Sequence, residues 1–320
     1  MLPFIARRLA RGIVTLWGVS MIAFVLVKML PGDPARIVCD PHYHQCTGKG
    51  LVRLRRELGL DRPYWHQYLD YANGWLHIDV PALRGLWPNF ANSLELIMAA
   101  LVIQAVAGIG IGIAAALRHR SWIDTLTAIT TTVLFAVPAF VFGLMGLALT
   151  YQWNWFGAFD FSGLFSVTTA PPPFPRALAP VYWFHHLLLP TLALAFGGIA
   201  TTALVTRGSL LETLSAEYVT TARAKGLPAR MVVGKHALKI ALFPVVSVIG
   251  LDLGRLFAAD ILIEMIWHWP GAGPILINAA VFRDGPTVLA VVVVVAAVFV
   301  IANTLVDIAY VAIDPRVRAK

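Results

Sequence analysis

The chain contains few charged residues. Asp, Glu, Lys and Arg make up 13% of its 320 residues, against about 25% in soluble globular proteins. Hydrophobic residues fill the deficit, at 58% of the chain with a mean hydropathy of +0.74. This composition excludes an ordinary soluble domain and indicates an integral membrane protein.

The motifs of nucleotide-binding and hydrolytic proteins are also missing. No G-x-x-x-x-G-K-[ST] occurs, because Gly48-Lys49-Gly50 lacks both the first glycine and the hydroxyl residue after the lysine. H-E-x-x-H and G-x-S-x-G are absent as well. The alternating glycines Gly108, Gly110 and Gly112 lie in an apolar run, where small residues allow helices to approach closely. We therefore expect no ATP site and no catalytic site in this chain, and we expect these glycines to serve packing.

Six apolar stretches are long enough to span a bilayer, since about 20 residues of helix cross the hydrocarbon core. Lipid offers no hydrogen-bond partners to the backbone, so a spanning segment must form all of its backbone hydrogen bonds internally, as a helix does. The sequence therefore predicts an all-α polytopic membrane protein with six transmembrane helices. The stretches are Ile13 to Leu30, Leu94 to Leu117, Ile129 to Tyr151, Leu187 to Thr206, Ala241 to Ile263 and Val288 to Ala312.

The positions of the basic residues predict the orientation, because Lys and Arg of short loops stay in the cytoplasm. Basic residues cluster before the first span, between the second and third, between the fourth and fifth, and after the sixth. Both termini are therefore predicted to be cytoplasmic, and the net charge of +8 follows from this topology without a nucleic-acid partner. These residues are Arg7, Arg8, Arg11, Arg118, Arg120, Arg207, Arg223, Lys225, Arg230, Lys235, Lys239, Arg316, Arg318 and Lys320.

Three parts follow from this topology. Residues 1–30 form a cytoplasmic N-terminus and the first span, 31–93 form an outer loop, and 94–320 form a core of five spans with a cytoplasmic loop at 207–240. Within the outer loop, the spacing of apolar residues from Leu51 to Leu60 predicts a short amphipathic helix that ends at Gly59.

The outer loop also contains both cysteines, Cys39 and Cys46, with His42 and His44 between them. An oxidising outer compartment favours a disulfide between the two cysteines. A metal site is less favoured, because four ligands within eight residues are more tightly spaced than the separated pairs of usual zinc sites. A third interpretation leaves these residues unpaired.

The fifth span carries four ionisable residues, Asp252, Arg255, Asp260 and Glu264, which are costly inside a membrane. Asp252 and Arg255 are three apart on a helix and can form an ion pair. One interpretation is a neutral pair that fixes helix packing, with Asp260 and Glu264 already in water. The other is that this face lines a wetted path for a solute.

A soluble-looking segment, Glu217 to Pro244, separates two apolar stretches on the cytoplasmic side. Glu217 to Lys225 has the composition of a helix, Gly226 and Pro228 predict a turn, and Arg230 to Leu242 can form a second short helix. Ala222, Ala224 and Gly226 leave little bulk at this turn. The segment could therefore insert into a groove of a soluble partner, or could lie among lipid headgroups.

Motifs along nearly the whole chain resemble those of permease subunits of ABC importers of the dipeptide, oligopeptide and nickel class. They are Ala6-Arg7-Arg8-Leu9, Pro31-Gly32-Asp33-Pro34, Glu57-Leu58-Gly59-Leu60-Asp61 with Pro63, Gln67-Tyr68, Pro138-Ala139-Phe140 with Gly143, His186 to Pro190, Glu217-Tyr218-Val219 with Ala222 to Leu227, Glu264, Trp269 to Gly273, Arg283-Asp284, Asn303, Asp307 and Asp314-Pro315-Arg316.

The resemblance implies a type I importer permease fold in a prokaryotic plasma membrane. It implies a second, related permease, two cytoplasmic ATPases that bind ATP and Mg, and an outer solute-binding protein. The segment from Glu217 resembles the family's EAA loop, whose coupling helix docks on the ATPase. The coupling residues implied are Glu217, Tyr218, Ala222, Arg223, Ala224, Lys225, Gly226 and Leu227.

The substrate implied is a short peptide, and a nickel or metal-chelate importer is the alternative. An ATP-independent transporter or channel is an alternative of another class, which predicts internal repeats that the sequence does not show.

Two departures from the family pattern bear on function. After Asp79, relatives usually carry a longer G-D-L-G-x-S segment before the second span, whereas this chain continues directly with Val80-Pro81-Ala82-Leu83. Docking of the binding protein could therefore differ from that in relatives. Relatives usually carry uncharged residues where Asp252, Arg255 and Asp260 stand. We therefore expect a path adapted to a charged or zwitterionic solute.

Overall fold

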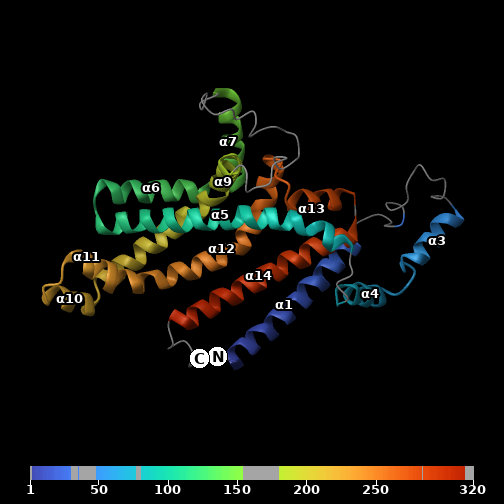
Figure 1. Ribbon diagram of the computed structural model, residues 1–320, viewed down its shortest axis with the longest axis horizontal. Coiled ribbons are helices and arrows are strands. Elements are labelled where there is room, and N and C mark those ends of the chain that lie inside the picture. The colour runs from blue at the N-terminus through green and yellow to red at the C-terminus, as the bar shows by residue number, and fades with distance from the viewer. Residues whose placement is uncertain are drawn as a thin grey trace. The chain divides into compact units, whose positions relative to one another are not determined.

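The computed structural model describes residues 2–29, 35, 48–76, 81–153, 180–282 and 284–313. In these ranges every regular element is a helix. The elements are α1 (Leu2–Met29), α3 (Lys49–Glu57), α4 (Tyr64–Leu76), α5 (Pro81–Leu117), α6 (Trp122–Ala136), α7 (Ala139–Trp153), α9 (Pro180–Leu214), α10 (Glu217–Ala224), α11 (Ala229–Met231), the π-helical η2 (Val232–Ala237), α12 (Leu238–Ile266), α13 (Ala272–Val281) and α14 (Gly285–Ile313). Figure 1 shows their order by colour.

Five helices are long and apolar enough to cross a membrane, and a bent pair of helices brings the number to six if the pair is one span. The five lie within α1, α5, α9, the continuous helix Ala229–Ile266, and α14. This architecture confirms the predicted all-α class with several candidate spans, while the cytoplasmic position of both termini stays a prediction.

The expected third span, Ile129 to Tyr151, is not one straight helix. It is divided between α6 and α7, which meet at an angle of 96°. The break lies at Val137, whose backbone is extended, and Pro138 follows it. A residue before proline is pushed out of the α region, and proline cannot donate the helical hydrogen bond, so the chain bends there.

The chain forms two compact units, Met1–Ala91 with Gly271–Lys320, and Asn92–Pro270. In the first unit, α1 packs along α14 through close contacts at two glycines. A Cβ on Gly12 would lie 2.6 Å from Val300, and one on Gly285 would lie 2.6 Å from Val27. Small residues at such seams let membrane helices approach closely.

The segment between α1 and α5 contains the helices α3 and α4. The predicted amphipathic helix at Leu51 to Leu60 is confirmed as α3, which ends where Gly59 takes a φ of +65°. The backbone N–H of Gly59 donates to the carbonyl of Arg56, and that of Leu60 donates to the carbonyl of Arg55. This pattern is the Schellman motif, which ends a helix.

Helix α4 is attached to α1 by polar contacts. Lys28 Nζ donates to Gln67 Oε1 at 2.5 Å, and the hydroxyls of Ser20 and Tyr68 lie 2.9 Å apart. The helix α4 therefore packs on α1.

In the second unit, α9 packs against α6, α7 and α12. Two glycines of α5 face α9: a Cβ on Gly108 would lie 2.6 Å from Thr202 Cβ, and one on Gly112 would lie 2.6 Å from Thr206 Cβ. Gly110 points into open space. The predicted packing role is therefore confirmed for Gly108 and Gly112, and Gly110 takes no part in this contact.

Candidate functional site

The segment that separates the apolar stretches forms a knuckle of α10, a turn and α11, at one end of α9 and α12 (Figure 1). The helix α10 starts at Glu217, as predicted, and its last turn leads into Gly226, which has a φ of +75°. Residues with a side chain rarely adopt this left-handed conformation, whereas glycine does so at little cost. Pro228 follows and caps α11, accepting hydrogen bonds from the N–H groups of Met231 and Val232.

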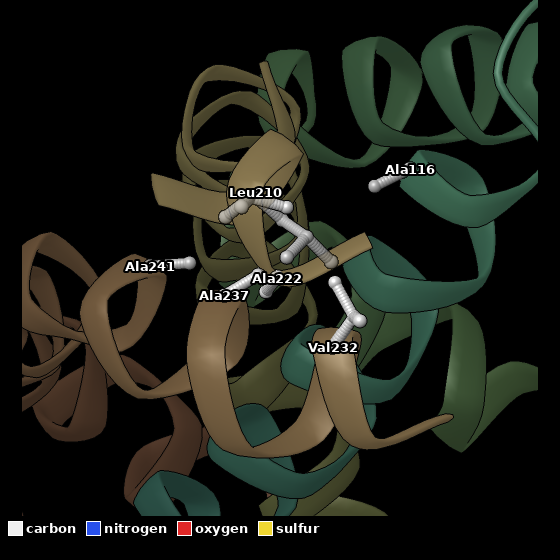
Figure 2. Packing of buried hydrophobic residues seen from close by; sticks show 7 residues of the cluster. Ala116, Leu210, Ala222, Val232, Ala237 and Ala241 are labelled. Atoms are coloured by element: carbon white, nitrogen blue, oxygen red, sulfur yellow. The ribbon is translucent and has the colours of Figure 1, made fainter. Parts of the chain in front are cut away.

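A small apolar cluster holds the knuckle against the membrane helices. Figure 2 shows side chains of α5, α9, α10, η2 and α12 converging there. Val219 and Ala222 are the contributions of α10, and Leu227 of the turn packs against their cluster. The buried members are Ala116, Leu210, Val219, Ala222, Val232, Ala237 and Ala241.

The residues that the resemblance implied for coupling divide between two faces of the knuckle. Ala222 is buried in the cluster and Leu227 is half-buried, so both of them position α10. The other six are exposed, on the face of the knuckle that points away from the cluster (its exposed face). They are Glu217, Tyr218, Arg223, Ala224, Lys225 and Gly226. The exposed face thus combines an aromatic ring, both signs of charge and a turn without bulky side chains, which suits contact with a groove of another protein.

The second half of the knuckle differs from expectation. The sequence predicted a separate short helix from Arg230 to Leu242, but α11, η2 and α12 form one continuous helix, Ala229–Ile266. Pro244 does not stop it. A π-helical stretch at Val232–Ala237 lies within this helix. The knuckle is therefore joined to the fifth span without a flexible break.

The charged residues of that fifth span lie in a polar network with α5. Arg255 Nε lies 3.1 Å from Asp252 Oδ1, so the predicted ion pair is confirmed. Asp252 Oδ2 accepts a hydrogen bond of 2.7 Å from Gln104 Nε2 of α5. Asp252 is buried, whereas the Arg255 side chain is 43% exposed.

Asp260 and Glu264 lie one turn apart nearer the end of α12, and both are buried. They are not in water, which contradicts one of the two interpretations of these acids. Their carboxyl groups interact with each other, and Ser93 of α5 donates a hydrogen bond of 2.5 Å to Glu264 Oε1. Their role in a solute path stays a prediction.

The sequence analysis missed an ion pair that joins α6 to α9. Asp124, in the first turn of α6, accepts hydrogen bonds from Arg207 Nε at 2.5 Å, Arg207 Nη2 at 2.9 Å and the Arg120 N–H at 2.9 Å. His119 Nδ1 lies 3.0 Å away. Arg207 was expected in a loop, but α9 continues past it to Leu214. A lone acid in the first turn of an apolar helix was the available signal.

The cysteines Cys39 and Cys46 and the histidines His42 and His44 lie outside the described residues. Within the ranges that are described, no group of three His, Cys, Asp or Glu side chains could hold a metal ion. The disulfide and the metal alternative therefore stay predictions.

Comparison with known proteins places this geometry in a family context. Residues 108–319 match the family described as binding-protein-dependent transport system inner membrane component, and residues 1–93 match the N-terminal family of the same membrane components. The dipeptide transport system permease protein DppB of Escherichia coli is 35% identical, with 100% of each chain covered.

Two further relatives are similar over their whole length. The di/tripeptide transport system permease protein DppB of Pseudomonas aeruginosa is 35% identical, with 99% of each chain covered. The glutathione transport system permease protein GsiC of Escherichia coli is 32% identical, with 100% of each chain covered.

Proposed function

Because this chain belongs to the family of binding-protein-dependent transport system inner membrane components, we propose that it is one of two related permease subunits of an ATP-driven importer of short peptides. Together the two permeases form the path across the membrane. A solute-binding protein on the outer side delivers the peptide. The names of the relatives favour peptides over nickel or metal chelates, since they concern dipeptides, di/tripeptides and glutathione.

The observation that carries the proposal is the knuckle of α10 and α11. Its buried face is fixed by Val219 and Ala222 in an apolar cluster, while its exposed face carries Tyr218 and Lys225. A projection that is held in place by packing is suited to transmit a conformational change from a soluble partner to the membrane helices. The chain has no phosphate-binding motif. In our proposal two cytoplasmic ATPase subunits therefore bind ATP and Mg, and the exposed face of the knuckle docks on one of them.

The orientation follows from the same proposal. The knuckle must lie in the cytoplasm to reach an ATPase, and the charge distribution puts both termini on that side. The helices α3 and α4 then lie on the outer side, where the solute-binding protein arrives. The membrane is the plasma membrane of a prokaryote, as in the bacterial relatives.

The test is reconstitution of the complex from the tagged chain, co-expressed with the ATPase, permease and binding-protein genes of its own organism. We expect the chain to co-purify with a second permease and two ATPases. In proteoliposomes, uptake of a labelled dipeptide should require ATP and the loaded binding protein. Uptake without ATP would favour a secondary transporter or channel, and ATP-driven uptake of nickel but not of peptide would favour the metal alternative.

A further inference from the structure

Arg255 is an exposed cation far inside a membrane-spanning helix. It lies about three turns before α12 ends at Ile266, and its side chain is 43% exposed. A guanidinium at such a depth is costly unless it meets water or an anion. Asp252 supplies one anion, whose Oδ1 lies 3.1 Å from Nε. Among the described residues, neither Nη1 nor Nη2 of Arg255 has a hydrogen-bond partner.

The orientation of this guanidinium is fixed from one side. Asp252 Oδ1 lies 3.1 Å from Nε, and Asp252 Oδ2 accepts a hydrogen bond from Gln104. An arginine bound at Nε keeps its two terminal nitrogens available as a planar fork, which matches the two oxygens of a carboxylate. Asp252 and Gln104 therefore act as positioning residues, because they orient the fork without occupying it.

Adjacent glycines of α9 make room for the two polar side chains. A Cβ on Gly197 would lie 3.5 Å from Arg255 Nη1, so the fork passes directly over this glycine. A Cβ on Gly198 would lie 1.7 Å from Gln104 Oε1, so a larger residue there would force the Gln104 side chain to move. This Oε1 is buried and has no hydrogen-bond partner among the described residues.

A buried acceptor without a donor is costly, and a native structure usually supplies one. The unpaired Gln104 Oε1 is covered by Gly198 and leaves no room for a guest, whereas the Arg255 fork is exposed. The exposed fork of Arg255 offers a pair of cationic donors. The C-terminus of a peptide carries the complementary group, a carboxylate.

We propose that Arg255 binds the carboxylate of the peptide during its passage, with its guanidinium oriented by Asp252 and Gln104 over Gly197. The inference rests on the proposed peptide import and adds the residue that selects the solute. Nothing is consumed in this step, and the ion pair with Asp252 stays in place while the free edge of the guanidinium changes partners.

The test uses the complete complex in proteoliposomes with saturating, dipeptide-loaded binding protein. We compare Arg255→Gln, Arg255→Lys and the double variant Asp252→Asn with Arg255→Gln, which leaves no unpaired buried carboxylate. Arg118→Gln is the matched control, since it removes one exposed positive charge at the end of α5. Uptake, ATP hydrolysis and recovery of all subunits are measured for each.

We expect Arg255→Gln and the double variant to lower uptake about tenfold or more, as loss of a charge-assisted bidentate contact should do. Arg255→Lys should lower uptake less, and Arg118→Gln should not change it. Subunit recovery and ATP hydrolysis without binding protein should be unchanged in all. A dipeptide amide bound by the same binding protein should enter poorly in the wild type and lose this disadvantage in Arg255→Gln.

Two results would overturn the inference. One is full dipeptide uptake by the double variant with the preference for the free acid intact. The other is loss of the second permease on replacing Arg255, which would mean that the fork pairs with that subunit. Failure of the proposed function would look different, because the wild-type complex would then import no peptide at all.

Discussion

Arg207 of α9 holds Asp124 of α6 through two hydrogen bonds, Nε to Oδ1 at 2.5 Å and Nη2 to Oδ2 at 2.9 Å. Asp124 also accepts the N–H of Arg120, whose φ of +63° is unusual for a residue with a side chain. One carboxylate therefore fixes the short turn between α5 and α6 and attaches α6 to α9. This contact joins helices 83 residues apart in the sequence.

We expect Asp124→Ala and Arg207→Ala each to lower the melting temperature of the purified complex, because each leaves a partly buried charge without its partner. The double variant should lose less than the sum of the two single losses, because the two side chains act on each other. Thermal unfolding followed by tryptophan fluorescence measures all three. Additive losses would show that the two residues stabilise the fold independently.

The turn at Gly226 gives a prediction about coupling. Gly226→Val forces a β-branched residue into the left-handed region, at a cost of about 1–2 kcal/mol, although nothing lies within 4 Å of the added Cβ. We expect binding-protein-stimulated ATP hydrolysis to fall while the permease pair stays intact. Gly208→Ala is the matched control, since it lies in α9 with open space and no positive φ. Equal stimulation in both variants would contradict the role of the turn.

The neighbouring glycines of α9 should respond differently to the same change. Gly198→Ala puts a methyl group 1.7 Å from Gln104 Oε1, so we expect overpacking to destabilise the complex by about 1–3 kcal/mol. Gly197→Ala meets its nearest atom, Arg255 Nη1, at 3.5 Å, an ordinary contact. It should be close to neutral in stability. Chemical unfolding of both variants in the same detergent checks the difference, and equal losses would refute the proposed fit of Gln104.

The glycine series of α5 offers a further comparison. Gly108→Ala and Gly112→Ala each place a Cβ 2.6 Å from a threonine Cβ of α9, and should cost about 1–3 kcal/mol through overpacking. Gly110→Ala meets nothing within 4 Å. It should gain slightly from the better helix propensity of alanine. Expression level and melting temperature report the order, which would be lost if α5 did not pack on α9 along this face.

The sequence predicted those parts of the structure that depend on neighbours in the chain. The apolar runs gave the spans, the spacing from Leu51 to Leu60 gave α3, and the interval between Asp252 and Arg255 gave their ion pair. The bend at Pro138 was also within reach, since proline disfavours a helix at the residue before it. It was missed because hydropathy continues unchanged across the break.

Contacts between distant helices could not be read from the sequence. Gln104 meets Asp252 across 148 residues, and Arg207 meets Asp124 across 83. Each pair depends on how helices pack, which the spacing along one helix does not specify. The division of the coupling residues into a buried Ala222 and an exposed Lys225 likewise depends on the apolar cluster beneath α10.

The π-helical stretch at Val232–Ala237 sets the phase of the helix that follows it. Since each residue advances an α-helix by about 100°, deletion of a single residue there would turn α12 by more than a quarter of a circle relative to the knuckle. Asp252 would then leave Gln104, and Arg255 would leave Gly197. The direction in which Arg255 points is thus determined some twenty residues earlier in the chain, beside the surface proposed to meet the ATPase.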